Sequence, residues 1–267
     1  VLYPDDNHYE GKSLRLKQQY FFVSATVQSI VRQHRAQYGT LRNFHEKHVI
    51  QINDTHPTLV IPELMRILLD VEGYSWNDAW NIVTHTVAYT NHTVLAEALE
   101  RWPQGLIENL LPRIWQILKE IAARYQRTLE QHFHGDQSKV SKMAIIWNGE
   151  VRMANLCVCA CYAVNGVSAL HSEILKQDVF HDAYTMRPEQ FKNVTNGVDP
   201  RRWLSQINPK LDALVKECTG GDDYLLHPEA IRGLEKYKDD QSVLSQLEAI
   251  KKENKRLFSA YLARESG

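Results

Sequence analysis

The sequence predicts an α/β protein in which helices flank a mainly parallel sheet. Short β-branched runs alternate with segments of helical periodicity as far as about residue 196, and such alternation is typical of parallel sheets. Polar residues follow two of these runs, in the stretches NDTH (53–56) and TNHT (90–93). Because ligands bind at the carboxyl ends of parallel strands, we expect both stretches at one edge of the sheet.

Hydrophobic periodicity and β-branched runs predict the individual elements. Helices are expected over 14–39, about 58–73, from 75, from about 95, 106–133 and 155–176, the last one interrupted at 165–166. Strands are expected at 49–53, at 84–92, in a hairpin within 142–156, and in a short run before 195–197. Beyond about residue 204 the chain becomes more charged and more purely helical.

Glycine and proline set several of these boundaries. Gly39 supplies a stop signal for the first helix. Pro62 fits only an early helical position, and Pro112 should kink or divide the helix that contains it. Asn148 and Gly149 together form the strongest short turn signal, which predicts the hairpin.

Composition excludes several classes of protein. A formal net charge of −1 argues against a nucleic-acid-binding protein, which would carry a basic excess. The 267 residues suit one large domain or two modest ones, and 43% apolar residues suffice for a core. Apolar runs are far shorter than the ~20 residues of a membrane span, so no membrane partner is expected.

The cysteines are interpreted as small core residues. They are Cys157, Cys159, Cys161 and Cys218, and the first three lie in an apolar stretch. A zinc site would need CxxC spacing and a second ligand pair, so no metal site is predicted. With neither a disulfide framework nor a signal peptide, a cytoplasmic location is favoured.

Polar residues at the expected strand ends are candidates for binding a hydroxyl-rich ligand. They are Asp54, His56, Asn91, His92 and Asn196. Most of these groups can both donate and accept hydrogen bonds, as sugar hydroxyls require. Each also has a structural interpretation, since a histidine at a strand end often binds backbone groups and Asp54 could equally cap the following helix. Pattern alone therefore leads only to an α/β protein with a polar crevice.

Six motifs in this sequence resemble those of the α-glucan phosphorylases, the family of glycogen, starch and maltodextrin phosphorylases. They are LYPDDNHYEGKSLRLKQQYF, QINDTHPTLVIPELMR, AYTNHTVLAEALERWP, MANLCV, AVNGVSALHSEIL and NVTNGVDPRRWL. They occur in the order found in the family and cover most of residues 1–208. A resemblance this long and dense is highly specific.

The resemblance implies a two-domain glycosyltransferase (GT-B) architecture, in which two Rossmann-like domains face each other across a deep cleft. Residues 1–196 would form the later part of the N-terminal domain. Residues 197–267 would form the crossover and the truncated start of the C-terminal domain. The sequence is therefore expected to be an internal part of a longer protein.

The resemblance also implies a reaction and its partners. Inorganic phosphate attacks the terminal α-1,4-linked glucose of a glucan and releases glucose 1-phosphate with retention. Pyridoxal 5'-phosphate assists proton transfer through its phosphate group, and the full-length enzyme is expected to be a homodimer. The motif of the Schiff-base lysine and the cations that hold substrate phosphate are not found in this sequence. This chain alone is therefore expected to be inactive.

Roles of individual residues follow from the motifs that match. His92 matches the histidine that contacts the glucosyl unit in the catalytic subsite, and Asn196 matches the asparagine that hydrogen-bonds the same sugar near its 6-hydroxyl. Asp54 matches the aspartate that lies behind this histidine, and His56 belongs to the layer around them. We therefore expect His92 and Asp54 to be catalytic, and His56 and Asn196 to help bind substrate.

The first residues of the chain resemble a gate. Asp6 and Asn7 match the mobile loop at the entrance of the family's cleft, and we expect them to contribute to substrate binding. Many members have an aromatic residue where this chain has His8. Purine stacking at this gate is therefore not expected.

Two other functions stay open. One is a non-catalytic glucan-binding module that shares the half-domain, and a pyridoxal-lysine motif further along the parent sequence would exclude it. The other is a nucleotide-sugar transferase of the same architecture, which the density of phosphorylase motifs around Asp54 and His92 disfavours. The sequence does not distinguish glycogen, starch and maltodextrin as the preferred glucan.

Overall fold

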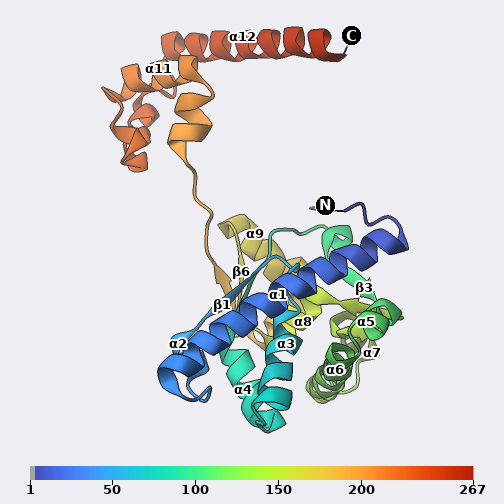
Figure 1. Cartoon of the computed structure of the whole chain (residues 1–267). Helices are drawn as coiled ribbons and strands as arrows, with labels where there is room; N and C mark the ends of the chain where they lie inside the picture. The colour runs from blue at the N-terminus through green and yellow to red at the C-terminus, as the bar shows by residue number, and fades with distance from the viewer. Residues whose placement is uncertain (1–3, 267) are drawn as a thin grey trace. The chain divides into compact units, whose positions relative to one another are not determined.

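The first part of the chain, up to Asn196, folds around a four-stranded sheet in which all neighbouring strands are parallel (Figure 1). In spatial order, the strands are β1 (Ile50–Asn53), β2 (Val87–Thr90), β6 (Ala163–Gly166) and β7 (Phe191–Asn193). Helices and a smaller antiparallel sheet complete the fold. The predicted α/β class with a mainly parallel sheet is confirmed.

The structure is a computed structural model that describes residues 4–266. The chain divides into two compact units, Val1–Asn196 and Gly197–Gly267. Both sheets lie in the first unit, and the described part of the second unit contains helices and turns.

Five helical elements of the first unit supply most of its helical core residues. They are α1 (Tyr9–Tyr38), α3 (Val60–Arg66), α4 (Trp76–Thr86), α6 (Pro112–His132) and α8 (Met153–Ala160). α3 continues without a break into a π-helical segment, η1 (Ile67–Val71). α3 contacts α1, α4 and α6, so it lies at the centre of the helical packing.

The long helix α1 follows from the periodicity of its apolar residues. Leu16, Val23, Val27 and Val31 recur at intervals of seven and four residues, and all four are buried. Gly39 ends the helix in the left-handed conformation, with φ of 71°, and its N–H donates to the carbonyl of Arg35 at 2.8 Å. The predicted helix is confirmed, although it begins at Tyr9 rather than residue 14.

The predicted hairpin forms part of a three-stranded antiparallel sheet. Its strands, in order, are β3 (Arg101–Pro103), β5 (Glu150–Arg152) and β4 (Ile146–Trp147). Asn148 and Gly149 both have positive φ angles, 50° and 77°, as a tight turn of type I′ requires. The helix expected from about residue 95 is wrong, because the chain forms only a 3-10 turn, Ala96–Ala98, before β3.

The helix expected over 155–176 is also wrong. α8 ends at Ala160, the chain then forms β6, and α9 (Ala169–Ile174) follows. A strand inside a parallel sheet is apolar on both faces, so its sequence is difficult to distinguish from a buried helix. At the end of β6, Gly166 is packed closely against α9, because a Cβ atom there would lie 2.6 Å from the Ser172 hydroxyl. The strand expected at 84–92 is shorter than predicted, since α4 extends to Thr86.

Several other boundaries agree with the sequence signals. Ser75 caps α4, with its side chain accepting a hydrogen bond from the Asp78 N–H. Pro62 lies in the first turn of α3. Pro112 separates α5 (Gln104–Leu110) from α6. Cys157, Cys159 and Cys161 belong to the core and are not in disulfides, which confirms their interpretation as small core residues.

The remaining helical elements are short, apart from one in the second unit. They are α2 (Phe44–Lys47), α7 (Gln137–Met143), α10 (His181–Met186), α11 (Pro209–Thr219) and α12 (Gln241–Ser266), with π-helical or 3-10 segments at Leu175–Val179, Pro188–Gln190, Arg201–Gln206, Asp223–Leu225 and Pro228–Tyr237. In the second unit, α11 is tied to the following turn by a buried hydrogen bond from Tyr224 to Asp212. Among the described residues, no helix is both long and apolar enough to cross a bilayer.

Candidate functional site

The carboxyl ends of β1 and β2 bring predicted site residues together. Asn53 and Thr90 are paired in register at the ends of these strands. The N–H of Asp54 donates to the carbonyl of Thr90 at 3.0 Å. His92 Nε2 lies 2.5 Å from Asn53 Oδ1, and an amide oxygen only accepts, so Nε2 carries the proton. Asp54 and His92 therefore follow adjacent strand ends, as the sequence predicts.

Asp54 turns the chain rather than capping a helix. Its φ of 60° is left-handed, a conformation that aspartate and asparagine adopt more readily than most residues. Its Oδ1 accepts a hydrogen bond from the N–H of Thr55 at 2.6 Å. α3 begins only at Val60, so the capping interpretation of Asp54 is wrong.

Asn91 anchors the segment that carries His92. Its side chain is fully buried, and its amide nitrogen donates to the hydroxyl of Tyr89 at 2.9 Å. Its Oδ1 accepts from the N–H of Thr93 at 2.9 Å and from His171 Nε2 at 3.0 Å. The side chain of Asn91 was a candidate for binding a ligand, but its hydrogen bonds are made within the protein.

His171 links this segment to the end of β6. Its Nδ1 accepts from the N–H of Val167 at 3.1 Å, which leaves the proton on Nε2 for Asn91. Burial lowers the pKa of His171, and the nearby charge of His92 lowers it further, against a hydrogen bond to Thr93 that raises it. A neutral imidazole in this tautomer satisfies both contacts.

Asn196 lies beyond the end of β7 at the same edge of the sheet. Its N–H donates to the carbonyl of Val167 at 3.0 Å, and the residue is exposed. β6 lies between β2 and β7, so the ends of those two strands are about 10 Å apart, given the usual spacing of strands. Val167 thus bonds both to Asn196 and, through its own N–H, to His171. We refer to Asn53, Asp54, Asn91, His92, His171 and Asn196 as the sheet-edge site.

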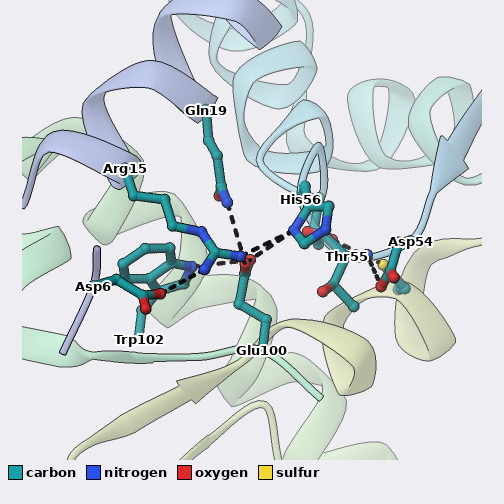
Figure 2. A network of polar contacts seen from close by, with 10 residues as sticks. Asp6, Arg15, Gln19, Asp54, Thr55, His56, Glu100 and Trp102 are labelled. Carbon is teal, nitrogen blue, oxygen red and sulfur yellow. Dashed lines mark hydrogen bonds and ion pairs between the residues drawn. The ribbon is translucent and has the colours of Figure 1, made fainter. Parts of the chain in front are cut away.

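A second group of polar residues surrounds Glu100 (Figure 2). Its Oε2 accepts hydrogen bonds from Arg15 at 2.9 Å, Gln19 at 3.1 Å and His56 at 3.2 Å, and its Oε1 accepts from the indole of Trp102 at 3.2 Å. The side chain of Glu100 is only 9% exposed. We refer to these five residues and Asp6 as the Glu100 cluster.

Arg15 connects the cluster to the start of the chain. Its Nη1 lies 2.5 Å from Asp6 Oδ2, while its Nη2 donates to Glu100. Asn7 does not join the cluster by any described contact, because its N–H and its amide nitrogen both donate to Asp5, at 3.0 and 2.7 Å. Of the two predicted gate residues, only Asp6 is therefore held by the cluster.

The charges of the cluster support one another. Burial raises the pKa of Glu100, but hydrogen bonds from His56 and Gln19 and the charge of Arg15 lower it below its usual value overall. The hydrogen bond to Glu100 raises the pKa of His56, burial opposes this, and the charges of Glu100 and Asp54 add to it. Arg15 acts in the opposite direction on His56. The carboxylate and the protonated imidazole therefore stabilise each other's charged forms.

A cavity of about 720 Å³ lies beside the cluster, and its walls include Asp6, Arg15, His56 and Glu100. His92 and Asn196 do not line it. Within the described residues, no group of three or more histidine, cysteine, aspartate or glutamate side chains is arranged to hold a metal ion. The cluster is therefore a polar wall of a cavity next to the sheet-edge site.

The described lysines do not fit an aldehyde cofactor bound through a Schiff base. Such a lysine needs a buried, low-dielectric setting that lowers its pKa. Every lysine in residues 4–266 is at least partly exposed. No residue of this chain is assigned to such a cofactor.

Sequence reasoning missed Asn53, Arg15, Glu100 and His171 as members of these sites. All four lie inside the quoted motifs. Asn53 belongs to the polar stretch 53–56 but was not named as a site residue, and the other three did not stand out by pattern. Glu100 follows a stretch that was expected to be helical, where a glutamate is usually on the solvent face. Its burial depends on β3 and α1 meeting in the folded chain.

Comparison with known proteins identifies the family. The sequence model described as carbohydrate phosphorylase matches residues 1–267. The muscle form of glycogen phosphorylase from Mus musculus is 48% identical over 99% of this chain and 33% of its own length. The glycogen phosphorylase of Bacillus subtilis is 47% identical over 95% of this chain and 32% of its own length. The chain spans about a third of the length of these relatives. It belongs to the carbohydrate phosphorylase family.

Proposed function

We propose that this chain provides the glucosyl-binding side of the active site of an α-1,4-glucan phosphorylase. The relatives that support the proposal are glycogen phosphorylases. The observation that carries it is the sheet edge, where Asp54, His92 and Asn196 follow the ends of three parallel strands. The proposed protein has the GT-B architecture, with residues 1–196 in its N-terminal domain and residues 197–267 at the crossover to the C-terminal domain.

In this proposal, His92 and Asn196 bind the same glucose. The two segments are separated by one strand, about 10 Å at the strand ends, and a hexose with a side chain on either side spans such a distance. The imidazole of His92 is exposed and held by Asn53 through Nε2, so its Nδ1 can accept a hydrogen bond from a sugar hydroxyl. The exposed amide of Asn196 can do both at once.

Asp54 and His56 support that binding. Asp54 lies on the strand end next to the one that carries His92, and its charge acts on His56. Together with the hydrogen bond to Glu100, the charge of Asp54 raises the pKa of His56. Asp6 and Asn7 precede α1 and form the proposed gate, and Asp6 is also on the wall of the cavity.

The proposed reaction is phosphorolysis. An oxygen of inorganic phosphate forms a bond with C1 of the terminal glucose, the bond from C1 to the glucan oxygen breaks, and that oxygen receives the proton that the phosphate gives up. The products are glucose 1-phosphate and a glucan shorter by one unit. Placed cations are needed to stabilise the charge on phosphate, and this chain is not proposed to supply them. The family cofactor, pyridoxal 5'-phosphate, and the homodimeric, cytoplasmic state likewise belong to the proposed complete enzyme.

Replacing His92 tests the proposal. In the complete protein, His92→Ala should lower kcat/KM for release of glucose 1-phosphate from a glucan by roughly a hundredfold, because a site that hydrogen-bonds a hydroxyl loses both binding and orientation. His132→Ala is the control, since His132 is exposed in the last turn of α6. Equal activity of the two variants would contradict the role of His92.

The isolated 267-residue chain provides a second test. It should release no glucose 1-phosphate from glycogen and phosphate above the level of a heat-inactivated sample, since it is not proposed to bind phosphate or cofactor. Release above that level would contradict the assignment of the chain to one side of the site.

A further inference from the structure

We propose that Glu100 is a positioning residue that fixes three site segments relative to one another. The first segment is residues 4–8, which Glu100 holds by way of its bond to Arg15. The second is the loop after β1, which it holds by its bond to His56. The third is the segment that carries His92, whose far end is Glu100 itself. The inference rests on the proposed function and extends it, because that proposal gives Glu100 no role. Glu100 itself is not placed in contact with substrate.

The first step is the convergence of separate elements on one carboxylate. Arg15 and Gln19 come from α1, His56 from the loop after β1, and Trp102 from β3. Three of these four donors bond to Oε2 and one bonds to Oε1, so both carboxylate oxygens are engaged. Glu100 is nearly buried, so losing its acceptors would leave several donors without partners, which is costly in a buried site.

The second step links Glu100 to the proposed gate. One nitrogen of Arg15 bonds to Asp6 and the other bonds to Glu100, so the guanidinium plane is fixed between two carboxylates. Two such bonds define the orientation of an arginine better than one. Arg15 Nη2 also lies 3.3 Å from His56 Nδ1, where two donors cannot bond to each other. Without Glu100, Arg15 keeps only its bond to Asp6, and His56 loses the acceptor of its Nδ1 proton.

The third step concerns the segment between Asn91 and Glu100. Its first residue is anchored by the buried amide of Asn91, and its last by the carboxylate of Glu100. Between them lie His92 and a single 3-10 turn, and residues 94–98 are all exposed. A segment with so few buried contacts depends on its two ends for its position. Glu100 is one of those ends.

Glu63 offers a matched comparison outside the proposed site. It is a fully buried carboxylate that also binds α1, accepting hydrogen bonds from Tyr20 at 2.9 Å and Ser24 at 2.7 Å. Arg66 neutralises its charge through two hydrogen bonds of 2.8 Å. Glu63 does not line the cavity beside Glu100. It therefore measures what loss of a buried carboxylate that binds α1 does to stability alone.

The experiment compares Glu100→Gln with Glu63→Gln in the complete protein. Both substitutions keep the shape and remove the charge, and both should lower Tm. At a temperature where both variants are folded, Glu100→Gln should lower kcat/KM for glucan phosphorolysis on the order of tenfold, since small misplacement of binding groups is costly. Glu63→Gln should change it less than about twofold. Equal losses in kcat/KM would overturn the inference.

A double-mutant cycle adds a readout that a purely structural role would not move. If Glu100 positions Asp6, then Asp6→Asn should lower kcat/KM less in the Glu100→Gln background than in the wild type. Additive effects would contradict the link, because Asp6 and Glu100 do not bond directly and act through Arg15.

Hydrogen exchange separates failure of the inference from failure of the proposed function. If the wild-type protein does not phosphorolyse glucan, the proposed function fails. Amide exchange of residues 5–8 and 93–99 then still reports on positioning, and Glu100→Gln should accelerate it while Glu63→Gln should not. Equal exchange in both variants would overturn the inference whatever the activity.

Discussion

The sheet-edge site and the Glu100 cluster are held together by different kinds of hydrogen bond. At the sheet edge, the partners are amides, hydroxyls, backbone groups and an imidazole kept neutral, as between Asn91 and His171. In the cluster, ionised groups meet, as Arg15 and His56 do at Glu100. A buried neutral network gives fixed geometry over a wide range of pH, whereas charged partners make geometry depend on protonation. The comparison suggests a rigid binding edge next to a more adjustable entrance.

The largest expected effect is the loss of Asn91. Asn91→Ala removes the hydrogen bonds that the Asn91 amide makes with the N–H of Thr93, Nε2 of His171 and the Tyr89 hydroxyl. We expect a loss of about 2–4 kcal/mol in the free energy of unfolding, measured by urea denaturation. Asn81→Ala, at an exposed position of α4, should stay within about 0.5 kcal/mol. A similar small effect for Asn91 would show that the sheet edge is not held by this amide.

Gly166 tests how tightly the sheet edge is packed. A Cβ atom there would lie 2.6 Å from the Ser172 hydroxyl and 2.9 Å from the backbone of Ser172. Gly166→Ala should therefore cost about 1–3 kcal/mol through overpacking. Gly105→Ala is the control, because no atom lies within 4 Å of a Cβ atom at this position in α5, and alanine should stabilise that helix by about 0.5–1 kcal/mol. If thermal unfolding showed that Gly166→Ala is as harmless as Gly105→Ala, the sheet edge would be packed less tightly than we infer.

The smallest expected effect is the pH dependence of the Glu100 cluster. The pKa of His56 is raised, so its contribution to stability is complete below the ordinary value of 6.5 and is lost as pH rises through the folded value. The pKa of Glu100 is lowered, so its contribution is complete above the ordinary value of 4.5 and is lost as pH falls through the folded value. Both contributions are present between these two values.

His56→Gln therefore reports on the cluster through its pH dependence. The difference in Tm between wild type and this variant should be greatest between about pH 4.5 and 6.5 and should shrink at higher pH, because His56 then loses its charge. The measurement is a series of thermal unfolding curves. A difference independent of pH would contradict the ion pair between His56 and Glu100.

Much of the fold could be predicted because its signals are local. Gly39, Pro112 and the pair Asn148-Gly149 each allow few backbone conformations, and each marks the expected boundary. β6 could not be predicted in the same way. It forms a strand because its backbone pairs on both sides with β2 and β7, which come from other parts of the sequence.

The candidate site likewise contains some residues that local signals predict and others that depend on distant contacts. Asp54 and His92 stood out because polar residues directly follow strands, and such residues reach the same edge of a parallel sheet. Glu100 did not stand out, since its importance comes from Arg15 and Gln19, more than eighty residues earlier in the chain. Contacts of this kind depend on tertiary packing and leave no periodic signal.

A crystal structure of the complete protein with a bound maltooligosaccharide would test the central claim most directly. We expect the imidazole of His92 and the amide of Asn196 to form hydrogen bonds with the same glucose ring, within the usual donor–acceptor range of about 2.7–3.2 Å. A sugar that contacts only one of them, or that binds away from the carboxyl ends of β2 and β7, would contradict the account.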